Sequence, residues 1–167
     1  NGYRTVYDLC SGSGCIGLSI AKECPETTCY LFELYDDALF YTQKNCQHSE
    51  LKNVKVFRHN VLTSPDFEIE NADIIVSNPP YIESDVVSTL EVSRFEPKRA
   101  LDGGLDGLDF YKVIAEKSYT ALEKGGMLAL EIGYNQGESV KALLKAFSEV
   151  QVYKDYGNND RVIIAIK

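Results

Sequence analysis

The segment Asn78-Pro79-Pro80-Tyr81 has the residue types needed to hold a reacting nitrogen atom. Two consecutive prolines keep the backbone extended and contribute carbonyl oxygens but no N–H donors. Asn78 adds a side-chain carbonyl acceptor, and Tyr81 offers a flat ring for stacking on a planar group. Two fixed acceptors can hold both hydrogens of a planar –NH₂ group and stabilise the positive charge that develops when its nitrogen attacks an electrophile. The segment therefore predicts chemistry at an amide or aromatic amine nitrogen, without a strong general base.

A glycine-rich stretch, "YDLCSGSGCIGLSIA" from Tyr7 to Ala21, is the second segment suited to a ligand. Gly12 and Gly14 allow a tight turn and a close approach of backbone to ligand. Glu33 lies 21 positions beyond Gly12 and can accept two hydrogen bonds from a ribose diol. This combination is typical of sites for adenosine-bearing cofactors, both nicotinamide dinucleotides and S-adenosylmethionine. Gly17 completes a literal Gly-x-Gly-x-x-Gly, but we expect it to serve helix–strand packing.

Strands and helices alternate along the chain, and their order predicts where both segments lie. Apolar runs bounded by turn residues predict strands at 4–10, 28–34, 53–60, 72–78, 127–133, 150–156 and 161–167. Helical spacing predicts helices at 15–24, 36–47, 106–126 and 135–147. We therefore expect an α/β fold: a doubly wound, mostly parallel seven-stranded sheet with an antiparallel C-terminal hairpin. Ligands of such sheets bind at the carboxyl ends of the strands, where both segments fall.

The stretch 82–107 is expected to be a long irregular loop, of a length usually found in functional loops. We expect Asp106 to be the N-cap of the helix that follows, and Gly125-Gly126 to end that helix. The apolar side of this helix is expected to comprise Leu108, Tyr111, Ala115 and Leu122.

Composition limits the classes of protein that remain. The 167 residues suit a single domain, and the apolar runs are too short to cross a membrane. A net charge of −8, from 17 basic and 25 acidic residues, argues against direct binding of long nucleic acid. Five cysteines without a C-x-x-C pair, and only two histidines, argue against a disulfide framework or a metal site. We expect buried, reduced thiols in a cytoplasmic, monomeric protein that holds no metal.

Five stretches together resemble the release-factor glutamine methyltransferases (the HemK/PrmC family), which have the Rossmann-like class I S-adenosylmethionine-dependent fold. They are "DLCSGSGCIGLSIA", "SNPPYI", "EVSRFEPKRALDGGLDGLDFY", "LALEIGYNQ" and "GNNDRV". The resemblance runs from about Val6 to Ile164. Asn-Pro-Pro-Tyr is shared with amino-methylating enzymes generally, including DNA adenine methyltransferases. The pattern "RFEP..AL.GG..GLDFY" is more particular to the glutamine enzymes.

The resemblance implies transfer of a methyl group from S-adenosylmethionine to the side-chain amide nitrogen of a protein glutamine, in the Gly-Gly-Gln loop of a peptide-chain release factor. It implies that the substrate glutamine is bound by Asn78, Pro79, Pro80 and Tyr81, of which Asn78, Pro79 and Tyr81 are expected to act in catalysis. The expected cofactor-binding residues are Asp8, Cys10, Ser11, Gly12, Ser13, Gly14, Glu33, Asn60, Val61 and Asn78.

The chain departs from the family pattern at three points. Cys10 stands where the family usually has glycine, which would crowd the loop. Asn60 and Val61 stand where the family commonly has an acidic residue and then an aromatic one, both contacting the adenine. The family's N-terminal helical domain has no counterpart in this sequence, so we expect residues 1–167 to be one catalytic methyltransferase domain.

Three other functions stay open at this point. An N(6)-adenine methyltransferase acting on a flipped base would share the Asn-Pro-Pro-Tyr segment, but it would need a basic groove. A nicotinamide dehydrogenase would share the glycine loop, but it gives Asn78 to Tyr81 no purpose. A non-catalytic module that only binds S-adenosylmethionine or a partner protein would be consistent with the departures at Cys10 and Asn60.

Overall fold

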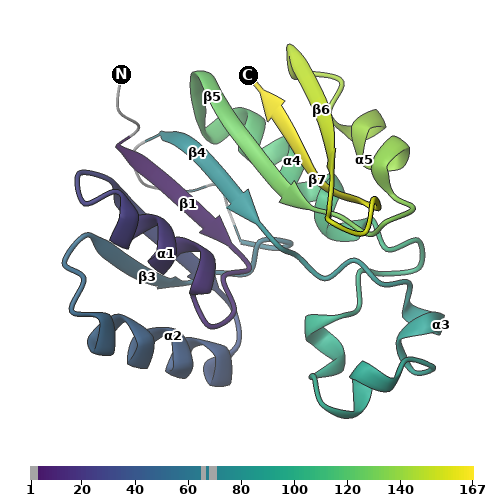
Figure 1. The fold of residues 1–167 in the computed structure, drawn as a ribbon, viewed down its shortest axis with the longest axis horizontal. Coiled ribbons are helices and arrows are strands. Elements are labelled where there is room, and N and C mark those ends of the chain that lie inside the picture. The colour runs from purple at the N-terminus through teal and green to yellow at the C-terminus, as the bar shows by residue number, and fades with distance from the viewer. Residues whose placement is uncertain (1–3, 65–66, 68–70) are drawn as a thin grey trace.

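A computed structural model describes residues 4–64, 67 and 71–167 of the chain. Within these residues the chain forms one seven-stranded sheet in the order β3-β2-β1-β4-β5-β7-β6 (Figure 1). The strands are β1 (Thr5–Leu9), β2 (Thr28–Glu33), β3 (Val54–Arg58), β4 (Ala72–Ser77), β5 (Leu122–Glu131), β6 (Glu149–Lys154) and β7 (Asp160–Ile166). Strands β1 to β5 are parallel, and β7 runs antiparallel between β5 and β6. The expected doubly wound sheet with an antiparallel C-terminal hairpin is confirmed.

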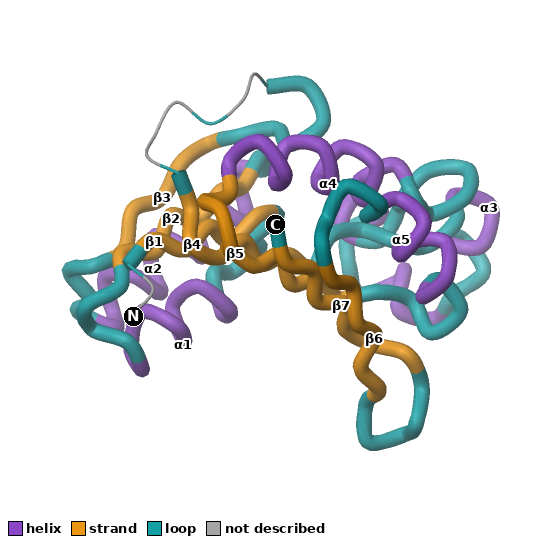
Figure 2. Tube along the Cα trace, turned by 90° about the horizontal axis from the view of Figure 1, so that it is seen from above, coloured by secondary structure: helices purple, strands orange, loops and turns teal. Residues whose placement is uncertain are grey.

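Helices cover both faces of the sheet, with α1 and α2 on one face and α4 and α5 on the other (Figure 2). The helices are α1 (Cys15–Glu23), α2 (Asp36–Ser49), α3 (Ser84–Val87), α4 (Asp109–Ala121) and α5 (Gly137–Leu143). None of the helices in the described part of the chain is long and apolar enough to span a membrane.

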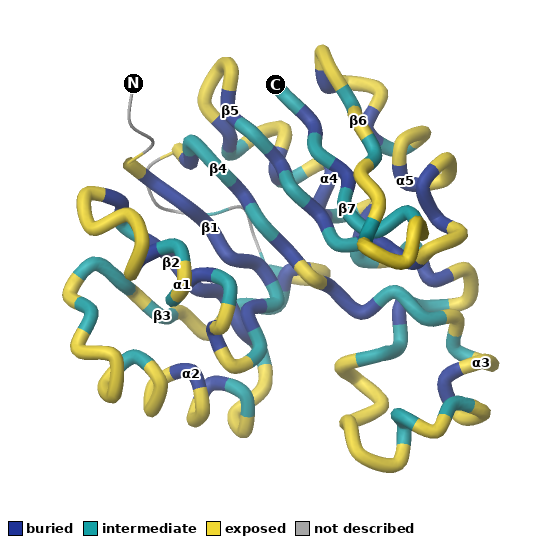
Figure 3. Tube along the Cα trace, viewed as in Figure 1, coloured by how far each residue is buried: buried dark blue, intermediate teal, exposed yellow. Residues whose placement is uncertain are grey.

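The central strands are buried on both sides, which is why their sequences are continuous apolar runs rather than alternating ones. All five residues of β1 are buried, as are five of the six in β2 (Figure 3). Tyr7 of β1 packs edge-on against Tyr30 and Phe32 of β2, with ring centroids 5.6 and 5.2 Å apart. This core fixes the strand ends that carry the site.

Two expectations about the helix after the long loop were wrong. The helix ends at Ala121, and Leu122, only 1% exposed, is the first residue of β5, where it pairs with Ala72. The residue at the helix N-cap is Leu108, whereas Asp106 lies just outside the helix and accepts a hydrogen bond from the Leu108 N–H at 3.0 Å. Gly125 lies within β5 with a φ of +81° and pairs with the chain end at Lys167.

The stretch 82–107 is more ordered than expected, and we refer to it as the 82–107 segment. It contains α3 and two short 3₁₀ helices, η1 (Glu91–Arg94) and η2 (Lys98–Ala100). Its two ends are paired, because the Ile82 N–H donates to Leu101 O at 2.9 Å and the Gly103 N–H donates to Ile82 O at 2.8 Å. The segment forms a lobe beyond the carboxyl ends of the strands (Figure 1).

The cysteines are all free, but they are not all buried. Cys29 is buried in β2, and Cys10 and Cys46 are partly buried. Cys15 and Cys24 are exposed, contrary to expectation, because they lie at the two ends of the short helix α1.

Candidate active site

The site is built where β1 and β4 end side by side. Leu9, the last residue of β1, pairs with Ser77, the last residue of β4, and the Ser77 hydroxyl donates to Leu9 O at 2.7 Å. The chain leaves β1 towards β2 and β3 and returns to β4 on the other side, so strand order reverses here. Cys10 and Asn78 follow directly at this reversal, which is the usual ligand position in doubly wound sheets.

The two loop glycines have different tasks. Both adopt left-handed backbone angles, with φ of +57° at Gly12 and +82° at Gly14. A Cβ at Gly14 would lie 3.0 Å from side-chain atoms of both Leu31 and Thr42, so this glycine lets the loop pack on the core. A Cβ at Gly12 would meet no protein atom within 4 Å. The space that a side chain would occupy at Gly12 is therefore open, so a ligand can approach the backbone there.

Gly17 and Asp8 act together behind the loop. The Gly17 N–H donates to Asp8 Oδ2 at 2.8 Å, and a Cβ at Gly17 would lie 2.6 Å from the Leu31 side chain. The expected packing role of Gly17 is confirmed. Asp8 is 1% exposed, and burial raises the pKa of its carboxyl group to about 7, although the bond from Gly17 opposes this. Asp8 thus holds the start of α1 and does not line the cavity.

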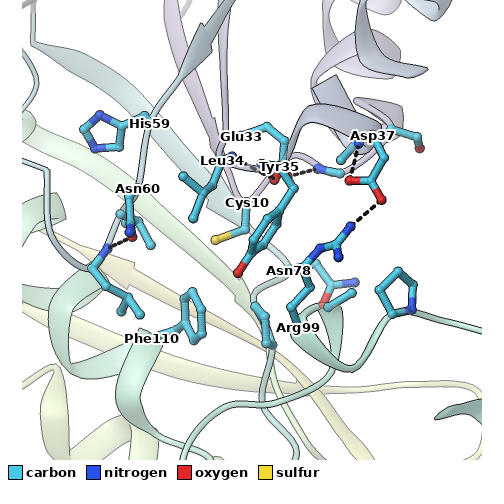
Figure 4. A pocket seen from close by; sticks show the side chains of 18 of the residues that line it. Cys10, Glu33, Leu34, Tyr35, Asp37, His59, Asn60, Asn78, Arg99 and Phe110 are labelled. Atoms are coloured by element: carbon cyan, nitrogen blue, oxygen red, sulfur yellow. Dashed lines mark hydrogen bonds and ion pairs between the residues drawn. The ribbon is translucent and has the colours of Figure 1, made fainter. Parts of the chain in front are cut away.

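Glu33 links the end of β2 to the glycine loop. The residue is 7% exposed; Oε2 accepts from the Gly12 N–H at 2.8 Å, and Oε1 accepts from the N–H groups of Leu34 and Tyr35 at 2.7 and 3.0 Å. These bonds fix the carboxylate at the cavity wall (Figure 4). A carboxylate has about four lone-pair sites, so Glu33 keeps capacity for a hydroxyl donor of a ligand.

Cys10 is the unusual residue of the loop. Its φ of +56° is left-handed, a conformation that costs a residue with a Cβ about 1 kcal/mol. Its side chain lines the cavity (Figure 4). Burial, reinforced by the Glu33 carboxylate, raises the pKa of the thiol to about 12, so the group is neutral.

One cavity of about 440 Å³ gathers most of the predicted site residues. Those that line it are Cys10, Gly12, Ser13, Glu33, Asn60, Val61, Asn78 and Pro80. Those that do not are Asp8, Ser11, Gly14, Pro79 and Tyr81. Ser11 and Gly14 are buried within the loop, and Pro79 is buried beside the exposed Asn78. Strand ends that are far apart in sequence therefore supply a common wall.

Asn60 uses part of its hydrogen-bonding capacity on its own turn. Its Oδ1 accepts from the Leu62 N–H at 3.0 Å, and its backbone N–H donates to Ser64 Oγ at 3.1 Å. The other side-chain atom, Nδ2, has the chemistry to donate to an adenine ring nitrogen. Val61 and Leu62 next to it make this end of the cavity apolar.

The far wall of the cavity was not predicted from sequence. It includes Phe110 of α4, Tyr35 and Asp37 at the start of α2, and Pro97 and Arg99 of the 82–107 segment. The Arg99 guanidinium forms an ion pair with Asp37 and lies 4.6 Å from the centre of the Tyr35 ring (Figure 4). The motif "FEPKRAL" contains this arginine, but only the folded segment brings it across to α2.

Tyr81 is turned to the β5–β7 side of the site. Its hydroxyl donates to Glu131 Oε1 at 3.4 Å and accepts from Arg161 Nη1 at 3.5 Å. Burial and the Glu131 carboxylate raise the pKa of this phenol. Its stacking role on a substrate stays a prediction.

The fold is that of the class I methyltransferases. A solved structure of TrmN from Thermus thermophilus superposes with a TM-score of 0.67 at 22% identity, covering 98% of this chain and 44% of that one. A methyltransferase from Pyrococcus furiosus superposes with a TM-score of 0.72 at 17% identity, covering 100% and 76%. At these identities the likeness shows the fold alone.

Residues 2–98 match the family described as the methyltransferase small domain, and the chain belongs to it. A release factor glutamine methyltransferase of Clostridium acetobutylicum is 39% identical over 100% of this chain and 60% of its own length. One from Thermodesulfovibrio yellowstonii is 38% identical over 97% and 59%. The chain thus spans about 60% of the length of these relatives.

Proposed function

We propose that this chain transfers a methyl group from S-adenosylmethionine to the side-chain amide nitrogen of a protein glutamine. The observation that carries the proposal is that Asn78 and Pro80 line the same cavity as Gly12 and Glu33. The same cavity is thus lined by an acceptor-rich segment suited to an –NH₂ group and by a loop suited to an adenosine cofactor. The names of the relatives, release factor glutamine methyltransferase, support the same reaction.

The residues that line the cavity fit S-adenosylmethionine by their chemistry. We expect Glu33, held beside Gly12, to accept from the ribose hydroxyls, and the open space at Gly12 to let the cofactor approach the backbone. Asn60, with Val61 beside it, offers a polar edge and an apolar surface to the adenine. When bound, the cofactor would supply an electrophilic methyl group carried on a sulfonium.

The chain's own residues position the nitrogen and hold its hydrogens. The Asn78 side-chain carbonyl accepts one N–H of the glutamine amide, and a backbone carbonyl of the Pro79-Pro80 pair, of which Pro80 lines the cavity, accepts the other. This favours a pyramidal nitrogen and stabilises its developing charge. Most of the rate enhancement then comes from the orientation of the reactants and from electrostatic stabilisation, rather than from acid–base catalysis. The methylated nitrogen becomes acidic and loses its extra proton to water, so no general base is required.

The proposed substrate is the Gly-Gly-Gln glutamine of a peptide-chain release factor, as the names of the relatives suggest. A release factor acts on ribosomes, so we place the reaction in the cytoplasm. We expect the chain to act as a monomer, with no metal, long nucleic acid or membrane involved.

The test is methyl transfer from labelled S-adenosylmethionine to a purified release factor, with the modified residue located by mass spectrometry. We expect label on the Gly-Gly-Gln glutamine, and a fall in kcat of about 100-fold or more in Asn78→Ala with cofactor affinity kept. Asn71→Ala, at an exposed asparagine before β4, is the matched control. Unchanged turnover in Asn78→Ala would refute the role of that side chain. Label on an adenine oligonucleotide, or cofactor binding without transfer, would refute the proposed substrate.

A further inference from the structure

Gln136 is a buried amide at the N-cap of α5 whose side chain makes three backbone hydrogen bonds. It is 8% exposed. Its Nε2 donates to Tyr81 O at 3.0 Å and to Gly107 O at 3.2 Å. Its Oε1 accepts from the Gly133 N–H at 2.9 Å; the Tyr111 hydroxyl lies 3.5 Å from Oε1 but donates its hydrogen at shorter range, to Glu131 O at 2.9 Å. A primary amide has two donors and two acceptor lone pairs, so both donors and one acceptor site of this side chain are used.

The surrounding backbone is shaped to admit this amide. A Cβ at Gly107 would lie 2.7 Å from Gln136 Nε2, and a Cβ at Gly133 would lie 2.7 Å from Oε1. Gly107 also has a φ of +67°. Glycines on both sides therefore let three separate stretches of chain converge on one side chain: the end of β5, the end of the 82–107 segment and the residue after Pro80.

The Tyr81 carbonyl is the important partner, because Tyr81 follows directly on Pro80 and its position sets the Asn78–Pro80 acceptors. The phenol of Tyr81 is held independently by Glu131 and Arg161. Fixing both the carbonyl and the ring leaves the preceding prolines little freedom. A displacement of about 1 Å in a reacting geometry can cost about 100-fold in rate.

We propose that Gln136 is a positioning residue for methyl transfer, which holds the Tyr81 peptide and thereby the acceptors that bind the substrate amide. Its effect on turnover rests on the proposed function, but its effect on the order of residues 81–107, which begin at Tyr81, does not. Two variants separate the contributions. Gln136→Met keeps the approximate size of the side chain but removes the hydrogen bonds to Tyr81, Gly107 and Gly133, whereas Gln136→Glu keeps the acceptor for Gly133 and loses the –NH₂ donors.

The first experiment measures kcat, KM for the release factor and cofactor affinity, together with hydrogen exchange of the backbone amides. In Gln136→Met we expect kcat to fall at least tenfold, cofactor affinity to stay within about twofold, and exchange to rise in residues 81–107 while β1 and α1 stay protected. Gln43→Met, at an exposed glutamine on α2, is the matched control and should match the unsubstituted chain.

The second experiment is a pH profile of Gln136→Glu relative to the unsubstituted chain. A carboxylate facing two backbone carbonyls is disfavoured, so the pKa of the introduced group should be raised. Its protonated form has one O–H that can donate to Tyr81 O. We therefore expect relative kcat to recover as the pH falls, a response that loss of packing would not produce.

Three results would overturn the proposal: unchanged exchange in residues 81–107, exchange raised uniformly across the sheet, or a flat relative pH profile for Gln136→Glu. If the unsubstituted chain transfers no label to glutamine, the proposed function fails. Hydrogen exchange in Gln136→Met then decides separately whether the Gln136 side chain orders residues 81–107.

Discussion

Asp8 is the residue whose ionisation should make stability depend on pH. The pKa of its carboxyl group is about 7 in the folded chain, against 3.8 for the free group, because burial disfavours the charged form. Between these values the native state binds more protons than the unfolded state, so the free energy of unfolding falls as pH rises from about 4 to about 7. Above that window the contribution has been lost.

Asp8→Asn should remove this dependence while its side-chain oxygen still accepts from Gly17. As the pH rises within this window, the unfolding free energy of the variant should increase relative to that of the unsubstituted chain. The expected increase is up to about 1.4 kcal/mol per pH unit. Urea unfolding at pH 5, 6, 7 and 8 measures it. Asp85→Asn, at an exposed carboxylate in α3, should leave the slope unchanged. Parallel curves for Asp8→Asn and the unsubstituted chain would contradict the assignment.

Cys10 offers a test of backbone strain at the cavity. At an ordinary position, replacing alanine by glycine destabilises a protein by about 0.4–1 kcal/mol through unfolded-state entropy. At the left-handed φ of +56° the order should reverse. We expect Cys10→Gly to be about 1 kcal/mol more stable than Cys10→Ala in chemical unfolding, since both lack the sulfur and only alanine keeps the strained Cβ. A more stable alanine variant would show that the backbone relaxes out of the left-handed region.

At the scale of elements, the sequence predicts secondary structure best where the local residue pattern and the burial in the folded chain agree. Strands β1, β2 and β4 are mainly apolar, and a glycine-rich loop follows β1 while a Pro-Pro pair follows β4. Their parallel order then places Cys10, Glu33 and Asn78 at one edge without further information. This is why the glycine loop, the acid and the acceptor segment could be predicted as one site.

The features that were predicted wrongly or not at all share a physical cause: contacts between residues far apart in the sequence decide the local structure. Leu122 fits the apolar side of a helix as well as the start of a strand, and its pairing with Ala72 selects the strand. Arg99 reaches the cavity only because the 82–107 segment folds back on α2. Gln136 lies 55 positions from the carbonyl that it binds, so no local pattern reveals its partner.

At the scale of the whole molecule, charge separates the two amino-methylating functions that share the Asn-Pro-Pro-Tyr segment. The chain carries −8, and two of the cations near the carboxyl edge of the sheet are paired with carboxylates. Arg99 is paired with Asp37, and Lys112 with Asp106 at 2.9 Å. A DNA-binding surface instead needs unpaired cations that release counterions from phosphates.

We therefore expect negligible affinity for duplex DNA, with a Kd weaker than about 100 µM at physiological salt, the upper end of non-specific binding. Fluorescence anisotropy with a labelled duplex at 50 and 200 mM salt measures this. A protein that binds DNA through many phosphate contacts loses about 10³-fold or more in affinity between these two salt concentrations. The affinity of this chain should show almost no salt dependence. Tight, strongly salt-dependent binding would instead favour a nucleic-acid substrate. Weak binding is consistent with the proposed substrate, because the side chains of a Gly-Gly-Gln loop carry no charge.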